Sequence, residues 1–166
     1  MQPENSRDNH HLWQLRNRLQ AESSDGLELL NNPTNNPICS VTLDDSVPCI
    51  TVTWKQYATS TQLRFVHENL LQMLTRHRIS RILGDDTALP TIHAEDRVWI
   101  TENWMPRARA AGLVAAASKR PEAYFGQLAV ENVQSVAPTS VTLRSFDKLE
   151  DAREWLRKVS LCEEAE

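Results

Sequence analysis

Apolar and polar positions alternate along two short runs, residues 38–43 and 49–54. Successive side chains of an extended chain point to opposite faces, so this alternation predicts strands that each bury one face. Residues 44–48, which include two aspartates and a proline, separate the runs and supply turn-forming side chains. The pattern therefore predicts an antiparallel hairpin with one apolar face.

Helical spacing replaces alternation farther along the chain. Thr59 and the next two hydroxyl residues can cap the first turn of a helix. Apolar residues then recur on one helical stripe, at Leu63, Val66, Leu70, Met73 and Leu74. Residues 76–78 are basic, which favours the carboxyl end of a helix. We expect a helix over this segment, with His67 on its surface beside Glu68.

The next part of the chain alternates strands with a helix. Residues 79–84 and 113–118 predict strands, and the second run is apolar on both faces, as is typical of the centre of a parallel sheet. Residues 93–111 predict a helix between them. Pro106 predicts a kink in that helix, because proline lacks a backbone donor and clashes with the preceding turn. Gly112 supplies a natural C-cap.

One more strand and two helices complete the pattern. We expect a short helix over residues 121–133, a strand over residues 139–144, and a last helix capped by Asp147, with Glu150 completing the capping box. Right-handed crossovers between parallel strands place helices on the faces of a sheet. The chain thus predicts an α/β fold with a mixed sheet, in the order ββαβαβαβα, and an antiparallel hairpin at the sheet edge.

The pattern also predicts the domain organisation. Residues 1–37 form an N-terminal extension, in which three leucines at helical spacing favour a short amphipathic helix. This extension ends in a linker rich in asparagine and proline, residues 31–37. We expect residues 38–161 to form the α/β domain and residues 162–166 to form an acidic tail.

Composition narrows the classes of function. A net charge of −4 argues against binding of nucleic acid, and only 4 glycines disfavour a phosphate-cradling loop. The 3 cysteines lack paired spacing and indicate reduced thiols in a cytoplasmic protein. No apolar run reaches the roughly 18 residues of a membrane span. Because no motif for a nucleotide or a metal is present, we expect neither a cofactor nor a metal.

Several residues of the second half, taken as a set, carry a family resemblance. They are Trp99, Trp104, Pro106-Arg107-Ala108, Gly112, Phe125-Gly126, Ser145-Phe146-Asp147, Ala152 and Trp155-Leu156. This set resembles the SpoIIAA-like group of mostly uncharacterised bacterial proteins, over about residues 31–159. The resemblance implies the STAS fold of anti-sigma-factor antagonists, which act through protein–protein contact. The same fold occurs in CRAL-TRIO-type lipid carriers, so the fold alone does not determine the function.

The chain departs from the antagonists at their phosphorylation site. The antagonists carry a serine or threonine in an Asp-Ser-type motif at the start of the helix after the central strand. The corresponding segment here reads Asp85-Asp86-Thr87, and the next hydroxyl is that of Thr91. We therefore expect no switch driven by a kinase at this position.

Candidate functional side chains follow the predicted strand of residues 79–84. Asp85 and Asp86 follow it, at the edge where open α/β sheets bind ligands. With His93 and Glu95 they are suited to hold a cation such as Mg²⁺ or to act as acid and base. A solvated loop with turn-capping carboxylates is the more common arrangement. Arg107 and nearby basic residues are suited to bind an anion, although solvent-facing charge is again the more common use.

Three functions remain open. The first expectation is a non-catalytic regulatory domain that binds a protein partner, or a second copy of itself, through the surface around Trp104 and the loop at residues 84–87. The second is a module that binds a small apolar ligand or lipid in a cavity lined by Trp99, Trp104 and Phe125. The third is an enzyme that uses the two aspartates and His93.

Overall fold

The computed structural model describes residues 27–31, 37–89, 92–121 and 141–159. The strands are β1 (Leu27–Asn31), β2 (Pro37–Asp44), β3 (Cys49–Trp54), β4 (Arg81–Asp85), β5 (Ala115–Lys119) and β6 (Thr142–Phe146). The helices are α2 (Ser60–His77), α3 (Ala94–Trp99), the π-helical segment η1 (Ile100–Trp104), α4 (Met105–Ala110) and α6 (Leu149–Lys158). The expected α/β class is confirmed.

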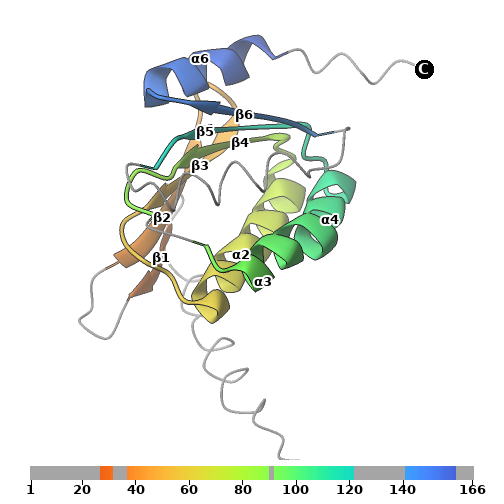
Figure 1. The fold of residues 1–166 in the computed structure, drawn as a ribbon. Coiled ribbons are helices and arrows are strands. Elements are labelled where there is room, and N and C mark those ends of the chain that lie inside the picture. The colour runs from red at the N-terminus through yellow and green to blue at the C-terminus, as the bar shows by residue number, and fades with distance from the viewer. Residues whose placement is uncertain (1–26, 32–36, 90–91, 122–140, 160–166) are drawn as a thin grey trace, which may run out of the picture.

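The strands form one sheet in the order β1-β2-β3-β4-β5-β6. β1, β2 and β3 pair antiparallel, and β3, β4, β5 and β6 pair parallel, so the sheet is mixed as expected. Figure 1 shows α2, α3 and α4 on one face of the sheet and α6 on the other. We call these the α2 face and the α6 face.

The strand β1 was not expected from the sequence. Its residues fall in the predicted N-terminal extension, yet their backbone pairs with β2, with Leu29 opposite Cys39. The predicted hairpin of β2 and β3 is confirmed, but β1 lies beyond it, so β2 is an inner strand. A short apolar run surrounded by polar residues, asparagine and proline gives too few positions for the alternation to be recognised.

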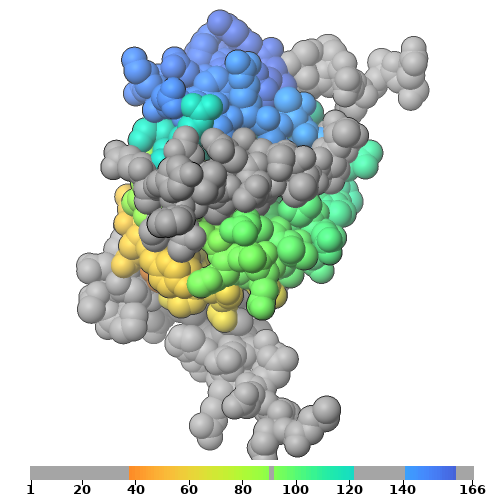
Figure 2. Space-filling view, viewed as in Figure 1, coloured from red at the N-terminus to blue at the C-terminus, as the bar shows by residue number. Residues whose placement is uncertain are grey.

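Each face of the sheet carries its own apolar core. The core on the α2 face includes Ile82 of β4 and Leu74 of α2, whereas the core on the α6 face includes Leu83 of β4 and Leu156 of α6. Neighbouring residues of β4 thus point to opposite layers, as the pleat of a strand requires. The space-filling view in Figure 2 shows the outer layers, with α2 in yellow, α4 in green and α6 in blue.

The helix α2 begins and ends where the sequence predicts. The Thr59 side chain accepts from the backbone N–H of Gln62, and the Gln62 side chain accepts from the Thr59 N–H, which together form a capping box. At the other end Arg78 adopts a left-handed conformation, with φ of 52°, and its N–H donates to the Leu74 carbonyl. The predicted apolar stripe is buried on one side of the helix.

The predicted irregularity near Pro106 is present, but it lies before the proline. α3 passes into η1, in which the Met105 N–H donates to the Ile100 carbonyl, and α4 then begins with Pro106 in its first turn. Proline is well tolerated in a first turn, so the wider π-type bonding ahead of it accommodates the missing donor. Gly112, with φ of 108°, ends α4 as expected.

One predicted cap is wrong. α6 follows Lys148, which caps it without a side-chain hydrogen bond, and Asp147 does not form the expected capping box. The Asp147 carboxylate instead accepts from Arg120 at 2.6 Å. The helix begins one residue later than predicted, so Asp147 lies before the N-cap position, and the Arg120 guanidinium provides its partner.

Three sequence expectations lie outside the described residues: the amphipathic helix of the extension, the short helix over residues 122–133, and the tail at residues 162–166. The strand expected over residues 139–144 is found at Thr142–Phe146. Within the described ranges, no helix has the length and apolar character needed to cross a membrane.

Candidate functional site

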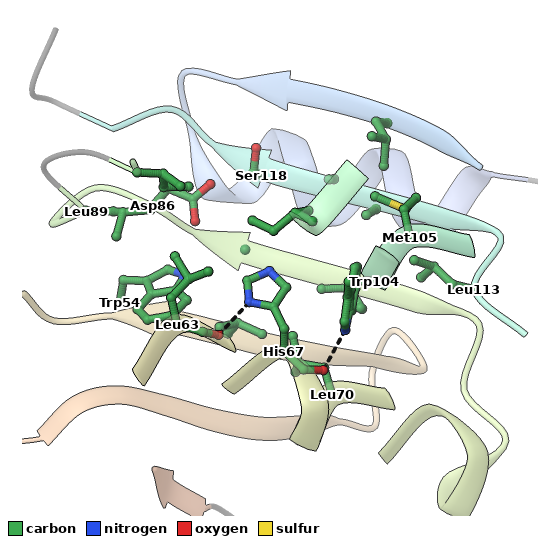
Figure 3. Close-up of a pocket in the computed structure, with 18 residues that line it drawn as sticks. Trp54, Leu63, His67, Leu70, Asp86, Leu89, Trp104, Met105, Leu113 and Ser118 are labelled. Carbon is green, nitrogen blue, oxygen red and sulfur yellow. Dashed lines mark hydrogen bonds between the residues drawn. The ribbon is translucent and has the colours of Figure 1, made fainter. Parts of the chain in front are cut away.

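A cavity of about 160 Å³ lies between the sheet and the helices of its α2 face. Its walls come from β3, α2, β4, η1, α4, β5 and β6 and from the loops beside them, and most of the side chains that line it are apolar. Figure 3 shows them around one central space. The polar side chains among them belong to Asp86, His67 and Ser118, together with the indole N–H groups of Trp54 and Trp104.

The volume of this cavity is unusual for a protein core. Native cores rarely contain voids much larger than a water molecule. An apolar cavity of about 150 Å³ is known to bind benzene. The cavity therefore matches a molecule the size of one aromatic ring.

Small residues on neighbouring strands leave the space open. Gly84 of β4 and Ala116 of β5 both line the cavity from the sheet. Larger residues at these two positions would reach toward α2 and reduce the volume. At Gly84, an added Cβ would lie 3.4 Å from the Asp86 Oδ1 atom, which places this carboxyl directly over the glycine.

Asp86 brings a carboxyl group into this apolar space. It follows Ile82 and Gly84 at the two-residue spacing of β4, and this spacing directs it to the α2 face. Only 9% of the residue is exposed. Among the described residues, none hydrogen-bonds to its carboxyl, while its backbone N–H donates to the Lys119 carbonyl. Burial, and secondarily the charge of Asp85, raise the pKa of Asp86 to about 7.

His67 presents a nitrogen to the same space from α2. Its Nδ1 atom lies 2.8 Å from the Leu63 carbonyl oxygen, which can only accept, so Nδ1 carries the proton. Burial lowers the pKa of His67, which favours the neutral ring with an unprotonated Nε2. The sequence placed His67 on the helix surface, whereas the structure places it against Trp104, with ring centroids 4.9 Å apart and nearly perpendicular.

Of the aromatic candidates, Trp104 lines the cavity and Trp99 does not. The Trp104 indole N–H donates to the His67 carbonyl at 2.6 Å, which ties η1 to α2. Trp99, at the end of α3, packs instead against α2, where the Arg64 guanidinium lies 5.1 Å from its ring centroid. Phe125 lies outside the described residues.

Arg107 has a structural role on the surface. Its guanidinium donates to both carboxylate oxygens of Glu68, at 2.9 and 2.5 Å, and also to Asn103. These bonds join α4 to α2, and the hydrogen bond to Glu68 raises the pKa of Arg107. The structure thus gives this cation a carboxylate partner within the protein.

Asp85 and Thr87 form a separate polar cluster. Asp85 accepts from the Thr87 backbone N–H at 3.1 Å and from its hydroxyl at 2.5 Å, and Lys119 donates to the same hydroxyl at 2.5 Å. The side chains of Asp85 and Asp86 leave β4 on alternate sides, so the two adjacent carboxylates serve different environments. The turn-capping arrangement noted as the more common one describes Asp85 well.

The other proposed acid–base residues lie at the start of α3. His93 is its N-cap, and its Nε2 atom is 2.8 Å from the Tyr57 hydroxyl, while Glu95 is exposed in the first turn. Over the described parts of the chain, no group of three or more histidine, cysteine or acidic side chains is arranged to hold a metal ion.

The geometry therefore brings Asp86, His67 and Trp104 together at one cavity. The first and third were predicted from sequence, and His67 was missed, although its spacing of four from Leu63 places it near the apolar stripe of α2. The protein was also compared with known families and proteins. No family model matches the chain, and no curated protein matches its sequence.

Proposed function

We propose that this protein binds a small, largely apolar molecule in the cavity between α2 and the sheet. The observation that carries this proposal is an apolar space of about 160 Å³ into which the carboxyl of Asp86 projects, with no hydrogen-bond partner among the residues that the structure describes. A core that served stability alone would fill this space, because an unfilled cavity is destabilising. Apolar walls with a few convergent polar groups are typical of ligand pockets.

We also propose that the domain belongs to the SpoIIAA-like group with the STAS fold, and that it acts in the cytoplasm. The mixed sheet, the antiparallel strands at its start and the helices on both faces support this assignment. Because the resemblance extends to lipid carriers of the same fold, it is compatible with a cavity that holds a ligand. It does not identify the ligand.

Partner binding is a second candidate, and two exposed apolar side chains at α3 favour it. Val98 of α3 is 53% exposed, and Tyr57, which hydrogen-bonds to the α3 N-cap His93, is 44% exposed. Both lie at or beside the predicted helix of residues 93–111, which carries Trp104 of the expected partner-binding surface. Native mass spectrometry of the purified chain tests this candidate, because a partner or second copy adds a protein mass that Val98→Ser should remove.

Toluene is a suitable first probe of the cavity, because it has the size of one ring and no polar group. The full chain, labelled with ¹⁵N, is titrated with toluene while amide resonances are followed. We expect saturable changes for residues of α2, β4 and β5. Ala116→Leu, which fills the cavity from β5, should abolish these changes.

Ala110→Leu is the matched control, because it adds the same side chain at an exposed position of α4. This variant should bind toluene like the wild type. If toluene and larger apolar probes leave the wild-type spectrum unchanged, or if Ala116→Leu binds toluene as the wild type does, the proposal fails.

A further inference from the structure

The polar groups of the cavity restrict the chemistry of its ligand. Figure 3 shows the Asp86 carboxyl and the His67 ring pointing toward the same part of the cavity, from the sheet and from α2 respectively. An apolar molecule alone would cover both groups and leave them without hydrogen bonds. Covering a polar group without a partner is unfavourable, so the bound molecule should supply one.

His67 contributes an acceptor. Since its Nδ1–H is engaged with the Leu63 carbonyl at 2.8 Å, its Nε2 atom offers a lone pair. The dashed bond in Figure 3 leaves Nδ1 on the α2 side, and the other ring nitrogen faces the cavity. A ligand group that meets His67 must therefore donate a proton.

The hydrogen bonds that the Asp86 carboxyl can make depend on its protonation. When the carboxyl is protonated, it can donate and accept, and when it is ionised it only accepts. The charged and titratable groups around it are Asp85 on its own strand, Cys39 on β2, His67 on α2 and Lys119 on β5. Of these, Lys119 is engaged with Thr87, so no cation from the described neighbours pairs with the Asp86 carboxyl.

This proposal rests on the proposed function and defines its ligand class. We infer that the cavity binds a small alcohol or phenol, whose uncharged hydroxyl is held by the Asp86 carboxyl and the His67 Nε2 atom. A hydroxyl donates one proton and accepts through its oxygen. It therefore satisfies the acceptor of His67 and the donor of a neutral Asp86 at the same time.

Charged head groups fit this cavity less well. A carboxylate would bring a second negative charge beside Asp86, and the described residues that line the cavity include no arginine or lysine. An ammonium would lose its hydration among apolar walls, and pairing with it would require Asp86 to ionise where burial raises the pKa of this carboxyl. The hydroxyl is the head group that leaves neither partner unsatisfied.

The test compares ligands of similar size and shape by isothermal calorimetry on the full chain: phenol, toluene, benzylamine and benzoate. We expect phenol to bind about tenfold more tightly than toluene, because the two differ chiefly in the hydroxyl. Asp86→Leu and His67→Phe should each reduce this preference, measured as the ratio of the toluene and phenol dissociation constants in the same variant, to near unity.

The outcomes separate this inference from the proposed function. If no probe binds the wild type, the proposed function fails and this inference fails with it. If toluene binds as tightly as phenol, or if both variants keep the preference for phenol, this inference alone is overturned. Tighter binding of benzylamine or benzoate than of phenol overturns it in the same way. Asp85→Leu, on the other side of the strand, is the control and should keep the preference.

Discussion

Asp85 and Asp86 show how far adjacent identical residues can differ. Asp85 is held by Thr87 in a turn, whereas Asp86 lies over Gly84 in an apolar cavity. The pleat of β4 creates the difference, since it sends successive side chains to opposite faces of the sheet. A sequence reading that treats them as one acidic pair loses this distinction.

The buried carboxyl makes stability depend on pH. The pKa of Asp86 is raised to about 7 by burial and by Asp85, while an unfolded aspartate has a pKa near 3.9. A group whose pKa is higher in the folded state stabilises the fold most below the unfolded pKa, and this contribution is lost as the pH rises through the folded pKa. The asparagine of Asp86→Asn cannot ionise. The free energy of unfolding of this variant, relative to that of the wild type, should therefore rise as the pH increases from about 4 to about 7, by on the order of 3–4 kcal/mol in total.

Urea unfolding at a series of pH values measures this difference between Asp86→Asn and the wild type. Asp85→Asn controls for the loss of an aspartate from the same strand and should not show the same rise. Cys39 and His67, which share the surroundings of Asp86, remain neutral at pH 7, because burial raises the pKa of Cys39 to about 12 and lowers that of His67. A difference between Asp86→Asn and wild type that stays constant with pH would contradict the prediction.

Among the elements, α2 supplies much of the cavity wall and depends on a well-formed start. The Thr59 hydroxyl accepts the Gln62 N–H, and the structure confirms the predicted cap. Thr59→Ala should lower the free energy of unfolding by about 1 kcal/mol, as is usual for the loss of a helix N-cap. Thr75→Ala, at an exposed position of the same helix, is the control in chemical unfolding. Equal effects of the two substitutions would show that the cap does not stabilise α2.

The elements best predicted from the sequence have strong local signals. The stripe and cap of α2, the β2–β3 hairpin and the end of α4 at Gly112 depend on periodicity and on backbone preferences that few residue types satisfy. β1 is a short run that becomes recognisable only through its pairing with β2, and the surroundings of the α6 start depend on a residue distant in sequence, because Asp147 pairs with Arg120. Local pattern contains no information on such pairs.

The candidate site was predictable only in part for the same reason. The strand-end position of Asp86 and the aromatic character of Trp104 are visible in the sequence. The cavity itself depends on which small residues face α2, and Gly84 and Ala116 become meaningful only once β4 and β5 are aligned in register. The orientation of His67 likewise depends on its hydrogen bond to the Leu63 carbonyl.

At the scale of the whole molecule, the sheet separates two layers of different character. The layer on the α2 face contains the cavity, and the layer on the α6 face is built from compact contacts of small and branched residues such as Ala117, Ala152 and Leu156. Ligand effects should therefore concentrate on the α2 face. Leu156→Ala empties a fully buried position on the other face and should cost about 2–5 kcal/mol of stability in urea unfolding, with toluene affinity unchanged. Loss of toluene affinity in a folded variant would show that the layers are coupled.

The same separation determines the behaviour of the cysteines. Cys39 belongs to the core on the α2 face and Cys49 to the core on the α6 face, both as free, buried thiols. The sheet lies between them, so they cannot form a disulfide without unfolding, in agreement with the reduced state predicted from the sequence. Burial also raises the pKa of both thiols, which keeps them in the unreactive protonated form.

Thiol labelling therefore reports on unfolding of the two layers. In a Cys162→Ser variant, which removes the remaining cysteine, a chromogenic aromatic disulfide reagent should leave the native protein unmodified and should react with both thiols in denaturant without a reductant. Toluene or phenol should slow the labelling of Cys39 at denaturant concentrations within the unfolding transition, because a ligand that fills the cavity stabilises the layer containing this thiol. Labelling of either thiol as fast as a free cysteine in the folded protein would contradict the burial described here, and absence of labelling in denaturant would indicate a disulfide instead.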